Sequence, residues 1–383
     1  MEYRRFGQTE KQISVFTMGG MRFLHVWDKP HDQLPADSEE HCYQMLQTAL
    51  DGGINLIETA KGYGKSERLI GRALPRLRQS RDQYHLMTKA SPTETAGQMR
   101  RHVEDALRHM GVDHIDFFAL HGINTRPLLR LSLRSGGPMS ALEALQREGK
   151  IGHIGFATHA PLPVILDTIQ SGRFAFINLH YYFFRQGNRT AIEAAAARDM
   201  GIFIISPQDK GGLLYTPPPR LAEQSAPLPI ANFNERWILS HPAIHTMTVG
   251  MSEPSHLDLH LHSLALGKPY WGAAERAVEI RLKQAAATTE LDRCGHCTAC
   301  LPCPERIEIP DLLRLEHLAR AHDMVAFAQY RYGLMEPNCH WVPGAHGDRC
   351  SDCGDCLPRC PQGLDIPLLV RQAHTRMHKA SGS

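Results

Sequence analysis

Eight short apolar runs between residues 13 and 250 constrain the fold of this chain more than any other feature. The runs are ISVFTM (13–18), INLIE (54–58), YHLMT (84–88), IDFFAL (115–120), IGHIGF (151–156), FAFINLH (174–180), IFIIS (202–206) and HTMTVG (245–250). Each has the length of a buried strand, and the longer stretches between them show helical periodicity. In one stretch, Met99, Val103 and Met110 fall on one helical face. Strands and helices that alternate eight times over roughly 250 residues are typical of a (β/α)₈ TIM barrel.

A doubly wound parallel sheet is the other α/β architecture that such alternation allows. Eight strands exceed its usual number of about six, and no GxGxxG motif follows a predicted strand. We therefore predict a TIM barrel over residues 1–275, followed by a second domain over residues 276–383.

Composition narrows the class of protein further. A hydrophobic content of 42% with 21% charged residues suits a packed core. The net charge is +2 and the basic residues are scattered, so we expect no nucleic-acid partner. No apolar run approaches 18 residues and the start, MEYRRFGQTE, has no apolar signal region, so we expect a cytoplasmic protein without a membrane partner.

Cysteines mark the second domain. Eight of the ten lie in two runs, CGHCTACLPCP (294–304) and CSDCGDCLPRCP (350–361), which indicates metal binding rather than a disulfide framework. The runs belong to an internal repeat, because CPERIEIPDLLRLEHLAR (303–320) resembles CPQGLDIPLLVRQAHTR (360–376). Each copy has Cys-Pro, then Ile-Pro, then an apolar helix that begins near the proline. The repeat predicts a small, mostly helical, pseudo-symmetric domain.

The spacing of the second run is that of a bacterial ferredoxin, in which the fourth cysteine binds the other cluster. This rule assigns one [4Fe–4S] cluster to Cys294, Cys297, Cys300 and Cys360. It assigns the second cluster to Cys350, Cys353, Cys356 and Cys303. Two Cys₄ zinc sites are the alternative. Cys339 is either a spare ligand or an unligated loop cysteine, and Cys42 is expected in the core.

Polar residues stand where successive barrel strands should end. The second strand leads to Glu58 and Tyr63, the third to Lys89, and the fourth to His121. Active sites of TIM barrels lie at these carboxyl ends. The four side chains suit proton transfer to a carbonyl oxygen, with Lys89 lowering the pKa of Tyr63 by charge and His121 orienting the substrate.

These residues stand in stretches that resemble the aldo/keto reductases. YRRFGQTEKQISVFTMGG (3–20) is similar to their N-terminal hairpin and first strand. GINLIETAKGYGKSERLIGRAL (53–74), MTK (87–89) and DFFALH (116–121) resemble their segments that carry Glu58, Tyr63, Lys89 and His121. The resemblance covers residues 1–266 and implies an oxidoreductase that transfers hydride between a nicotinamide and a small-molecule carbonyl, with Tyr63 as general acid. The tail resembles the ferredoxin-type domain fused to one branch of that family.

The chain departs from the family pattern around the nicotinamide. Glu58 replaces an aspartate, and Ala157-Thr158-His159 replaces a Ser-Asn pair. Leu179 stands where a glutamine is expected, and Ile205 where an aromatic residue would stack on the ring. These changes weaken the expected nicotinamide subsite.

The phosphate end of the expected cofactor site is better preserved. Lys210-Gly211-Gly212 follows the seventh strand and Gly250-Met251-Ser252 precedes the eighth helix, which suits a pyrophosphate, although tight turns would also explain the glycines. Met251 and His256 stand where basic residues would bind a 2′-phosphate, so NAD and NADP both stay open. The candidate cofactor residues are Thr158, His159, Ser206, Lys210, Gly211, Gly212, Gly250 and Ser252.

Aromatic residues gather after the fifth and sixth strands. His159, His180, Tyr181, Tyr182 and Phe183 could line a flat pocket for an aromatic substrate or a flavin, or they could be packing.

Hydride carries two electrons whereas an iron–sulfur cluster moves one at a time, so the combination poses a mechanistic question. One hypothesis is an oxidoreductase whose clusters connect the barrel to a one-electron carrier protein. A second is an NAD(P)-dependent carbonyl reductase with structural clusters. A third is a non-catalytic redox or iron sensor, or an electron-transfer adaptor.

Overall fold

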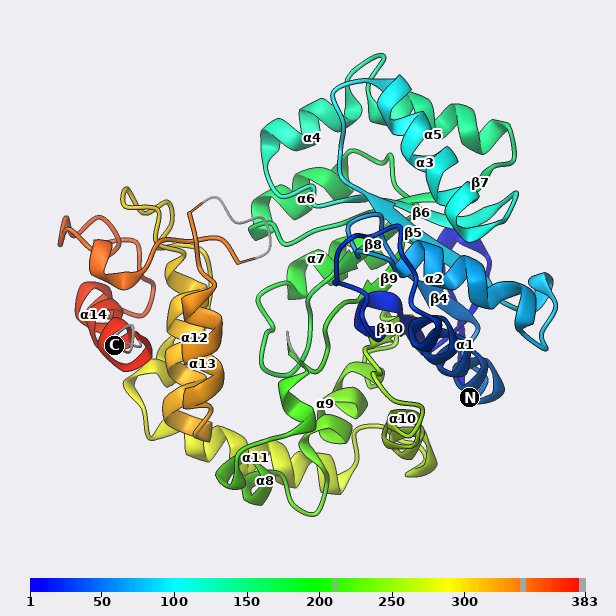
Figure 1. Cartoon of the computed structure of the whole chain (residues 1–383). Helices are drawn as coiled ribbons and strands as arrows, with labels where there is room; N and C mark the ends of the chain where they lie inside the picture. The colour runs from blue at the N-terminus through cyan, green and yellow to red at the C-terminus, as the bar shows by residue number, and fades with distance from the viewer. Residues whose placement is uncertain (210–211, 338–341, 379–383) are drawn as a thin grey trace. The chain divides into compact units, whose positions relative to one another are not determined.

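A closed barrel of parallel strands forms the first part of the molecule (Figure 1). The computed structural model describes residues 1–209, 212–337 and 342–378. The order around the barrel is β10-β3-β4-β5-β6-β7-β8-β9. The strands are β3 (Phe16–Gly19), β4 (Leu56–Glu58), β5 (His85–Ala90), β6 (Ile115–His121), β7 (Ile151–Ala157), β8 (Phe176–Leu179), β9 (Gly201–Ile204) and β10 (Thr246–Val249). Each overlaps one of the predicted runs, so the (β/α)₈ barrel is confirmed and the doubly wound sheet is excluded.

Helices alternate with the barrel strands along the chain (Figure 1). Their bounds are α1 (Ala36–Asp51), α2 (Ser66–Ala73), α3 (Ala96–Met110), α4 (Arg126–Leu133), α5 (Pro138–Arg147), α6 (Leu162–Gln170), α7 (Arg189–Ala196), α8 (Pro219–Ser225), α9 (Ile230–Leu239) and α10 (His256–Ala265). In helix α3, the N-cap, the terminating glycine and the apolar face all follow from the sequence. Its N-cap Thr95 accepts a hydrogen bond from the Gln98 backbone, Gly111 ends it with a φ of 65°, and its predicted apolar face is buried.

An antiparallel hairpin of β1 (Tyr3–Arg5) and β2 (Gln12–Ser14) precedes the barrel. The apolar run 13–18 was predicted as one strand, but it is divided between β2 and β3. At the division, the Ser14 backbone donates to Asn55 Oδ1 and its hydroxyl donates to the Phe16 carbonyl. Val15 between them donates its backbone N–H to the Glu2 carbonyl and accepts the Met247 N–H of β10, so it joins the hairpin to the barrel.

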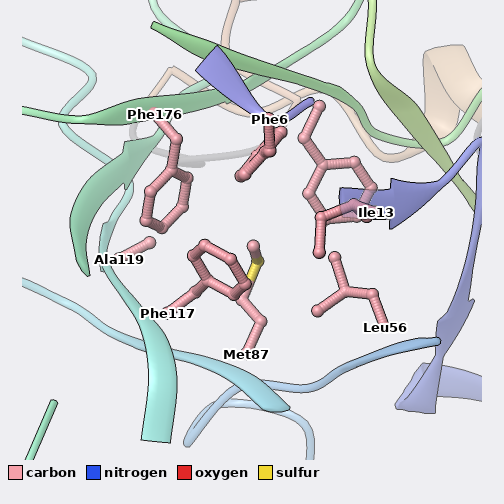
Figure 2. Packing of buried hydrophobic residues seen from close by; sticks show 8 residues of the cluster. Phe6, Ile13, Leu56, Met87, Phe117, Ala119 and Phe176 are labelled. Atoms are coloured by element: carbon pink, nitrogen blue, oxygen red, sulfur yellow. The ribbon is translucent and has the colours of Figure 1, made fainter. Parts of the chain in front are cut away.

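Phe6, between the two hairpin strands, fills the amino-terminal end of the barrel (Figure 2). Its ring lies 5.4 Å from that of Phe117 and 5.7 Å from that of Phe176. A Cβ on Gly201 would lie 2.8 Å from the Phe6 ring, so only glycine fits at the start of β9. Leu56 and Met87 complete this layer with other apolar side chains. The amino-terminal end is therefore closed by core packing, and polar chemistry is confined to the carboxyl ends of the strands.

The chain divides into two compact units that do not follow the sequence in two consecutive blocks. The first contains residues 1–210 and 237–268, and the second contains residues 211–236 and 269–383. The second unit therefore includes α8, which the sequence places between two barrel strands. The predicted domain boundary between residues 275 and 276 stays a prediction.

Helices dominate the second unit (Figure 1). They are α11 (Ala273–Ala287), α12 (Ile309–His322), α13 (Val325–Gly333) and α14 (Ile366–Met377), and α12 packs against the other three. Pro310 and Pro367 stand in the first turns of α12 and α14, as the internal repeat predicts. Among the described residues, we find no helix that combines the length and apolar character needed to cross a membrane.

His322 at the end of α12 makes a testable contribution to stability. Only 4% of it is exposed, and its Nδ1 donates to Gln224 Oε1 of α8 over 2.8 Å. Burial, with smaller effects from His317 and Arg220, lowers its pKa from 6.5 to about 4. Between these pH values the unfolded chain binds the proton that the folded chain excludes, so stability falls as the pH falls.

We expect His322 to account for about 2 kcal/mol of stability lost between pH 7.5 and pH 5. Urea unfolding of the His322→Gln variant should be less dependent on pH than that of the wild type. His262→Gln is the control, because His262 is exposed on α10. Equal pH dependence in His322→Gln and the wild type would contradict the assignment.

Candidate active site and cysteine cluster

Alternation along the strands brings Glu58, Lys89 and His121 to one interior layer. Side chains two residues apart on a strand share a face. Leu56, Met87 and Ala119 belong to the core that closes the amino-terminal end, so the residues two positions further along also point inward. The layer above the apolar core is therefore polar, and it lies at the carboxyl ends of β4, β5 and β6.

The four predicted catalytic residues meet in the structure. Lys89 forms an ion pair with Glu58 and donates to the Thr59 carbonyl over 2.8 Å. The Lys89 Nζ lies 4.9 Å from the centre of the Tyr63 ring. The Tyr63 and His121 rings stand edge to face with their centroids 5.8 Å apart. Glu58 and Lys89 are buried, whereas Tyr63 and His121 are partly exposed.

Burial shifts the pKa values of Lys89 and Tyr63 at the centre of this site. It lowers the pKa of Lys89, whereas the Glu58 carboxylate in contact with Lys89 favours its ammonium form. Burial also raises the pKa of Tyr63. The expectation that Lys89 lowers the pKa of Tyr63 is therefore wrong for the protein without ligands. Lys89 directs its hydrogen bonds to Glu58 and Thr59, and it lies over the face of the phenol ring. Desolvation of the phenolate then dominates.

Among the described residues, the Tyr63 hydroxyl has no hydrogen-bond partner, so it is available to a ligand. A phenol that stays protonated, beside an imidazole and an ion pair, can donate a proton to an oxygen atom of a bound molecule.

The segment after β7 is held by its own neighbours. The Thr158 hydroxyl donates to the Ile123 carbonyl over 2.9 Å, and the His159 backbone donates to Asn124 Oδ1 over 2.7 Å. The His159 ring is joined to the His180 ring by a 2.9 Å contact between Nδ1 and Nε2. Thr158 is thus engaged in holding the loop, and His159 and His180 form an imidazole pair.

The tyrosines after β8 are packing residues. Tyr181 is buried against Trp237, with ring centroids 5.1 Å apart, and also contacts His241. Tyr182 is buried and its hydroxyl donates to Asp209 Oδ1 over 3.2 Å. The Phe183 ring packs edge to face against Phe184. These contacts favour packing for Tyr181 and Tyr182, and a pocket for an aromatic substrate or a flavin stays a prediction.

Asn178 is a buried polar residue of the barrel interior that the sequence analysis missed. It lies two positions after the core residue Phe176, so it faces the interior, whereas Leu179 next to it faces outward. Asn178 is fully buried, and its Nδ2 lies 3.4 Å from Met87 Sδ. Its Oδ1 has no hydrogen-bond partner among the described residues. Counting two positions from Phe176 would have found it.

Strained backbone and glycines mark the phosphate end of the predicted cofactor site. Ser206 has a φ of 49°, in the left-handed region that non-glycine residues rarely adopt. Gly212 has a φ of 72° and belongs to the second unit. Lys210 and Gly211 lie outside the described residues.

Gly250 and Ser252 follow β10 and are contacted by two basic side chains that sequence reasoning did not find. Arg22 Nη1 donates to the Gly250 carbonyl over 3.1 Å, and His41 Nε2 contacts the Ser252 carbonyl over 2.9 Å. The predicted ligand segment is therefore held by the loop after β3 and by α1.

One group of cysteines lines a single cavity in the second unit. The cavity encloses roughly 380 Å³, part of it open to solvent. Four of its lining residues are Cys303, Cys350, Cys353 and Cys356. Burial raises the pKa of the Cys356 thiol, and the thiols of Cys350, Cys353 and Cys303 add to that effect. The structure therefore brings together the four cysteines predicted for the second cluster.

In the other cysteine group, neighbouring thiols also raise one another's pKa. Burial raises the pKa of Cys294, and the nearby thiols of Cys297 and Cys360 contribute. Burial also raises the pKa of Cys300 to about 12, with contributions from Cys297, Cys294 and Cys356, and Cys300 lines the same cavity as Cys356. Among the described residues, no three His, Cys, Asp or Glu side chains converge on a point that would suit one metal ion. Cys339 lies outside the described residues, and Cys42 is buried as expected.

Comparison with known proteins identifies the barrel. The model of the aldo/keto reductase family matches residues 16–227. The chain is 28% identical over 240 residues to the oxidoreductase YrpG of Bacillus subtilis, covering 56% of this chain and 68% of that protein. It is 28% identical over 198 residues to the NADH-specific methylglyoxal reductase of Escherichia coli, covering 46% and 59%.

Solved structures agree on the fold. An aldo-keto reductase of Klebsiella pneumoniae in complex with NADPH superposes with a TM-score of 0.57 at 20% identity, covering 73% of this chain and 94% of that one. Because the family model spans more than half of the sequence, the chain belongs to the aldo/keto reductase family and is an oxidoreductase of that type.

Proposed function

We propose that the barrel interconverts a carbonyl and an alcohol, with Tyr63 as the proton donor and acceptor. The observation that carries this proposal is the buried Lys89–Glu58 ion pair beside Tyr63, with the Lys89 ammonium 4.9 Å from the phenol ring. When bound, a nicotinamide dinucleotide would supply or accept the hydride. NADH and NADPH stand in the names of different relatives, and the chain is not assigned to one of them.

In the reducing direction, the carbonyl carbon gains a hydride and the carbonyl oxygen gains the Tyr63 proton. The C=O double bond becomes a C–O single bond with new C–H and O–H bonds, and solvent returns the proton to Tyr63. His121 stands against the edge of Tyr63 and can orient the carbonyl oxygen. Lys89 and Glu58 hold opposite charges beside the phenolate that forms, and this stabilises it at the moment of transfer.

The buried carboxamide of Asn178 fits a polar ligand in the barrel interior. Its unpartnered Oδ1 costs folding free energy unless a donor reaches it. The amide group of a nicotinamide is a donor of the right chemistry. We therefore propose that Asn178, His159 and Thr158 orient the ring. The residues proposed for the phosphate end are Ser206, Gly250, Ser252 and the sequence-predicted Lys210, Gly211 and Gly212.

We further propose that the second unit is a ferredoxin-type domain that binds two [4Fe–4S] clusters. Eight neighbouring cysteines, five of which line one cavity, support this. The predicted ligands are Cys294, Cys297, Cys300, Cys360, Cys350, Cys353, Cys356 and Cys303. Such clusters would exchange single electrons with a carrier protein, and two of them would match the two electrons of one hydride. A flavin is the group that would divide those electrons.

Purely structural clusters are the second candidate, and one observation favours them. Ile309 and Ile366, the first residues of α12 and α14, line the same cavity as the cysteines, as does Val370. A cluster in that cavity would therefore contribute to the core of a small unit. A non-catalytic sensor or electron-transfer adaptor is less consistent with the assembled Tyr63, Lys89 and His121.

Anaerobic visible spectroscopy with iron, sulfide and flavin analysis tests the proposal. We expect broad iron–sulfur absorbance that bleaches in part when NADH or NADPH is added. Protein purified with zinc and without sulfide would refute the cluster assignment. Clusters that ignore both nucleotides, in a protein that reduces carbonyls, would favour the structural role.

Point variants suit this question better than a truncation at residue 285. Such a truncation cuts through α11 and removes α12, whose Ala321 carbonyl accepts a hydrogen bond from Gln224 of α8. Lost activity could then reflect a disturbed α8 rather than lost clusters.

A further inference from the structure

Arg22 stands at the carboxyl end of the barrel, next to the predicted phosphate segment. It ends a 3₁₀ turn (Gly20–Arg22) that directly follows β3. β3 and β10 are parallel neighbours, with Met18 opposite Val249. Residues 20–22 and residues 250–252 therefore leave the barrel side by side, although they are far apart in the sequence.

The charge of Arg22 is not neutralised by the protein. The side chain is partly buried, and its one hydrogen bond among the described residues runs from Nη1 to the Gly250 carbonyl. No carboxylate pairs with it in the described part of the chain, and Glu253 and Asp258 near the segment do not reach it. A guanidinium has five N–H donors, so most of them stay open to a ligand. A partly buried cation without a counter-ion is costly unless an anion binds.

Gly250 lets Arg22 approach closely. A Cβ on Gly250 would lie 3.2 Å from Arg22 Cδ, tighter than ordinary contact. On the other side, His41 contacts the Ser252 carbonyl while its Nδ1 accepts the Leu24 backbone N–H over 3.2 Å. Two basic side chains thus hold residues 250–252 by their carbonyl groups, and the Arg22 guanidinium is fixed beside them.

We propose that Arg22 binds a phosphate group of the nicotinamide dinucleotide; this inference rests on the proposed function of the barrel. Loops after the seventh and eighth strands of TIM barrels frequently bind phosphate, and Arg22 adjoins the loop after the eighth strand, β10. A planar guanidinium pairs with two phosphate oxygens at once. Arg22 thereby supplies, from the first barrel loop, the positive charge that Met251 and His256 do not supply.

Equilibrium binding of NADPH, NADH and 2′,5′-ADP to the full-length protein tests this inference. Arg22→Gln should weaken binding by about 10- to 100-fold, since a hydrogen bond to a charged group is lost. Arg22→Lys should retain part of the affinity. Arg101→Gln removes a positive charge from the exposed face of α3 and should bind as the wild type does. Melting temperatures of all variants show whether the fold is intact.

The ligands distinguish the two phosphate positions. A loss for NADPH and 2′,5′-ADP, with NADH unchanged, assigns Arg22 to the 2′-phosphate. An equal loss for NADPH and NADH assigns it to the pyrophosphate. If Arg22→Gln binds all three ligands as the wild type does, the inference is overturned while the proposed function stands. If the wild type binds neither NADH nor NADPH, the nicotinamide part of the proposed function fails first, and Arg22 has no such role.

Discussion

Replacing Tyr63 with phenylalanine is expected to lower kcat for carbonyl reduction by about 10²- to 10⁴-fold, the usual contribution of a general acid. The variant loses one hydroxyl group that has no partner among the described residues, so the fold should not change. Affinity for the nicotinamide should also stay the same, because the proton is transferred only in the chemical step. Steady-state kinetics with NADH and NADPH over a broad carbonyl panel measures the effect.

The direction in which the rates of reduction and oxidation change with pH is a further test of the role of Tyr63. Burial raises the pKa of Tyr63, so the phenol stays protonated through neutral pH and reduction should be insensitive to pH there. Alcohol oxidation needs the phenolate and should accelerate as the pH rises. Loss of Lys89 in a Lys89→Met variant should suppress oxidation strongly, because the phenolate then lacks its neighbouring charge.

Tyr43→Phe is the matched control for Tyr63→Phe. Tyr43 lies on α1, where the Arg76 guanidinium covers its ring at 4.1 Å, and its hydroxyl plays no part in the proposed site. Equal turnover of the wild type and Tyr63→Phe would contradict the proposal that Tyr63 is the general acid, and it would favour a sensor or adaptor.

The second large effect concerns the cysteine groups. Cys353→Ser should remove about half of the bound iron and sulfide, because one of two [4Fe–4S] clusters loses a thiolate ligand. If the clusters carry electrons to the barrel, turnover with a one-electron donor should be abolished while the circular dichroism of the barrel is unchanged. Cys42→Ala is the control: Cys42 is buried in α1, and burial raises its pKa well above the usual range.

Further cysteine variants test the crossed ligand sets. Cys360→Ser and Cys294→Ser should abolish the same cluster signal in electron paramagnetic resonance, because both thiols are assigned to one cluster. Cys303→Ser should instead resemble Cys353→Ser. If Cys360→Ser matched Cys353→Ser, each run would hold its own cluster, and the crossed assignment would be wrong. Unchanged iron in Cys353→Ser would exclude a cluster at the second run.

The sequence was informative wherever one local rule decides the outcome. Apolar periodicity located all eight barrel strands and the buried face of α3, because burial repeats every two residues in a strand and every 3.6 in a helix. It failed at residues 13–18, where Ser14 bonds to Asn55, the residue before β4, and the run is divided. The order of strands also placed Glu58, Lys89 and His121 at one end, because parallel barrel strands all end on the same side.

Other features depend on neighbours that the sequence does not order. One such feature is the pKa of Tyr63. Burial controls it, rather than the charge of Lys89, because Lys89 directs its hydrogen bonds to Glu58 and Thr59. The role of Asn178 depended on which residues of β8 face inward. The tyrosines Tyr181 and Tyr182 resolved into packing only when Trp237 and Asp209 came beside them.

By itself, the sequence determined the barrel, the helical repeat, the four polar residues at and after the strand ends and the two cysteine runs, because each depends on residues close along the chain or at repeated strand ends. Tertiary structure alone decided that Arg22 meets Gly250, that Asn178 keeps an open oxygen, and that Cys300 shares the cavity of Cys350 and Cys353. The physical reason is that desolvation and ion pairing act through space over a few ångströms. Residues more than two hundred positions apart can be closest neighbours once the barrel closes.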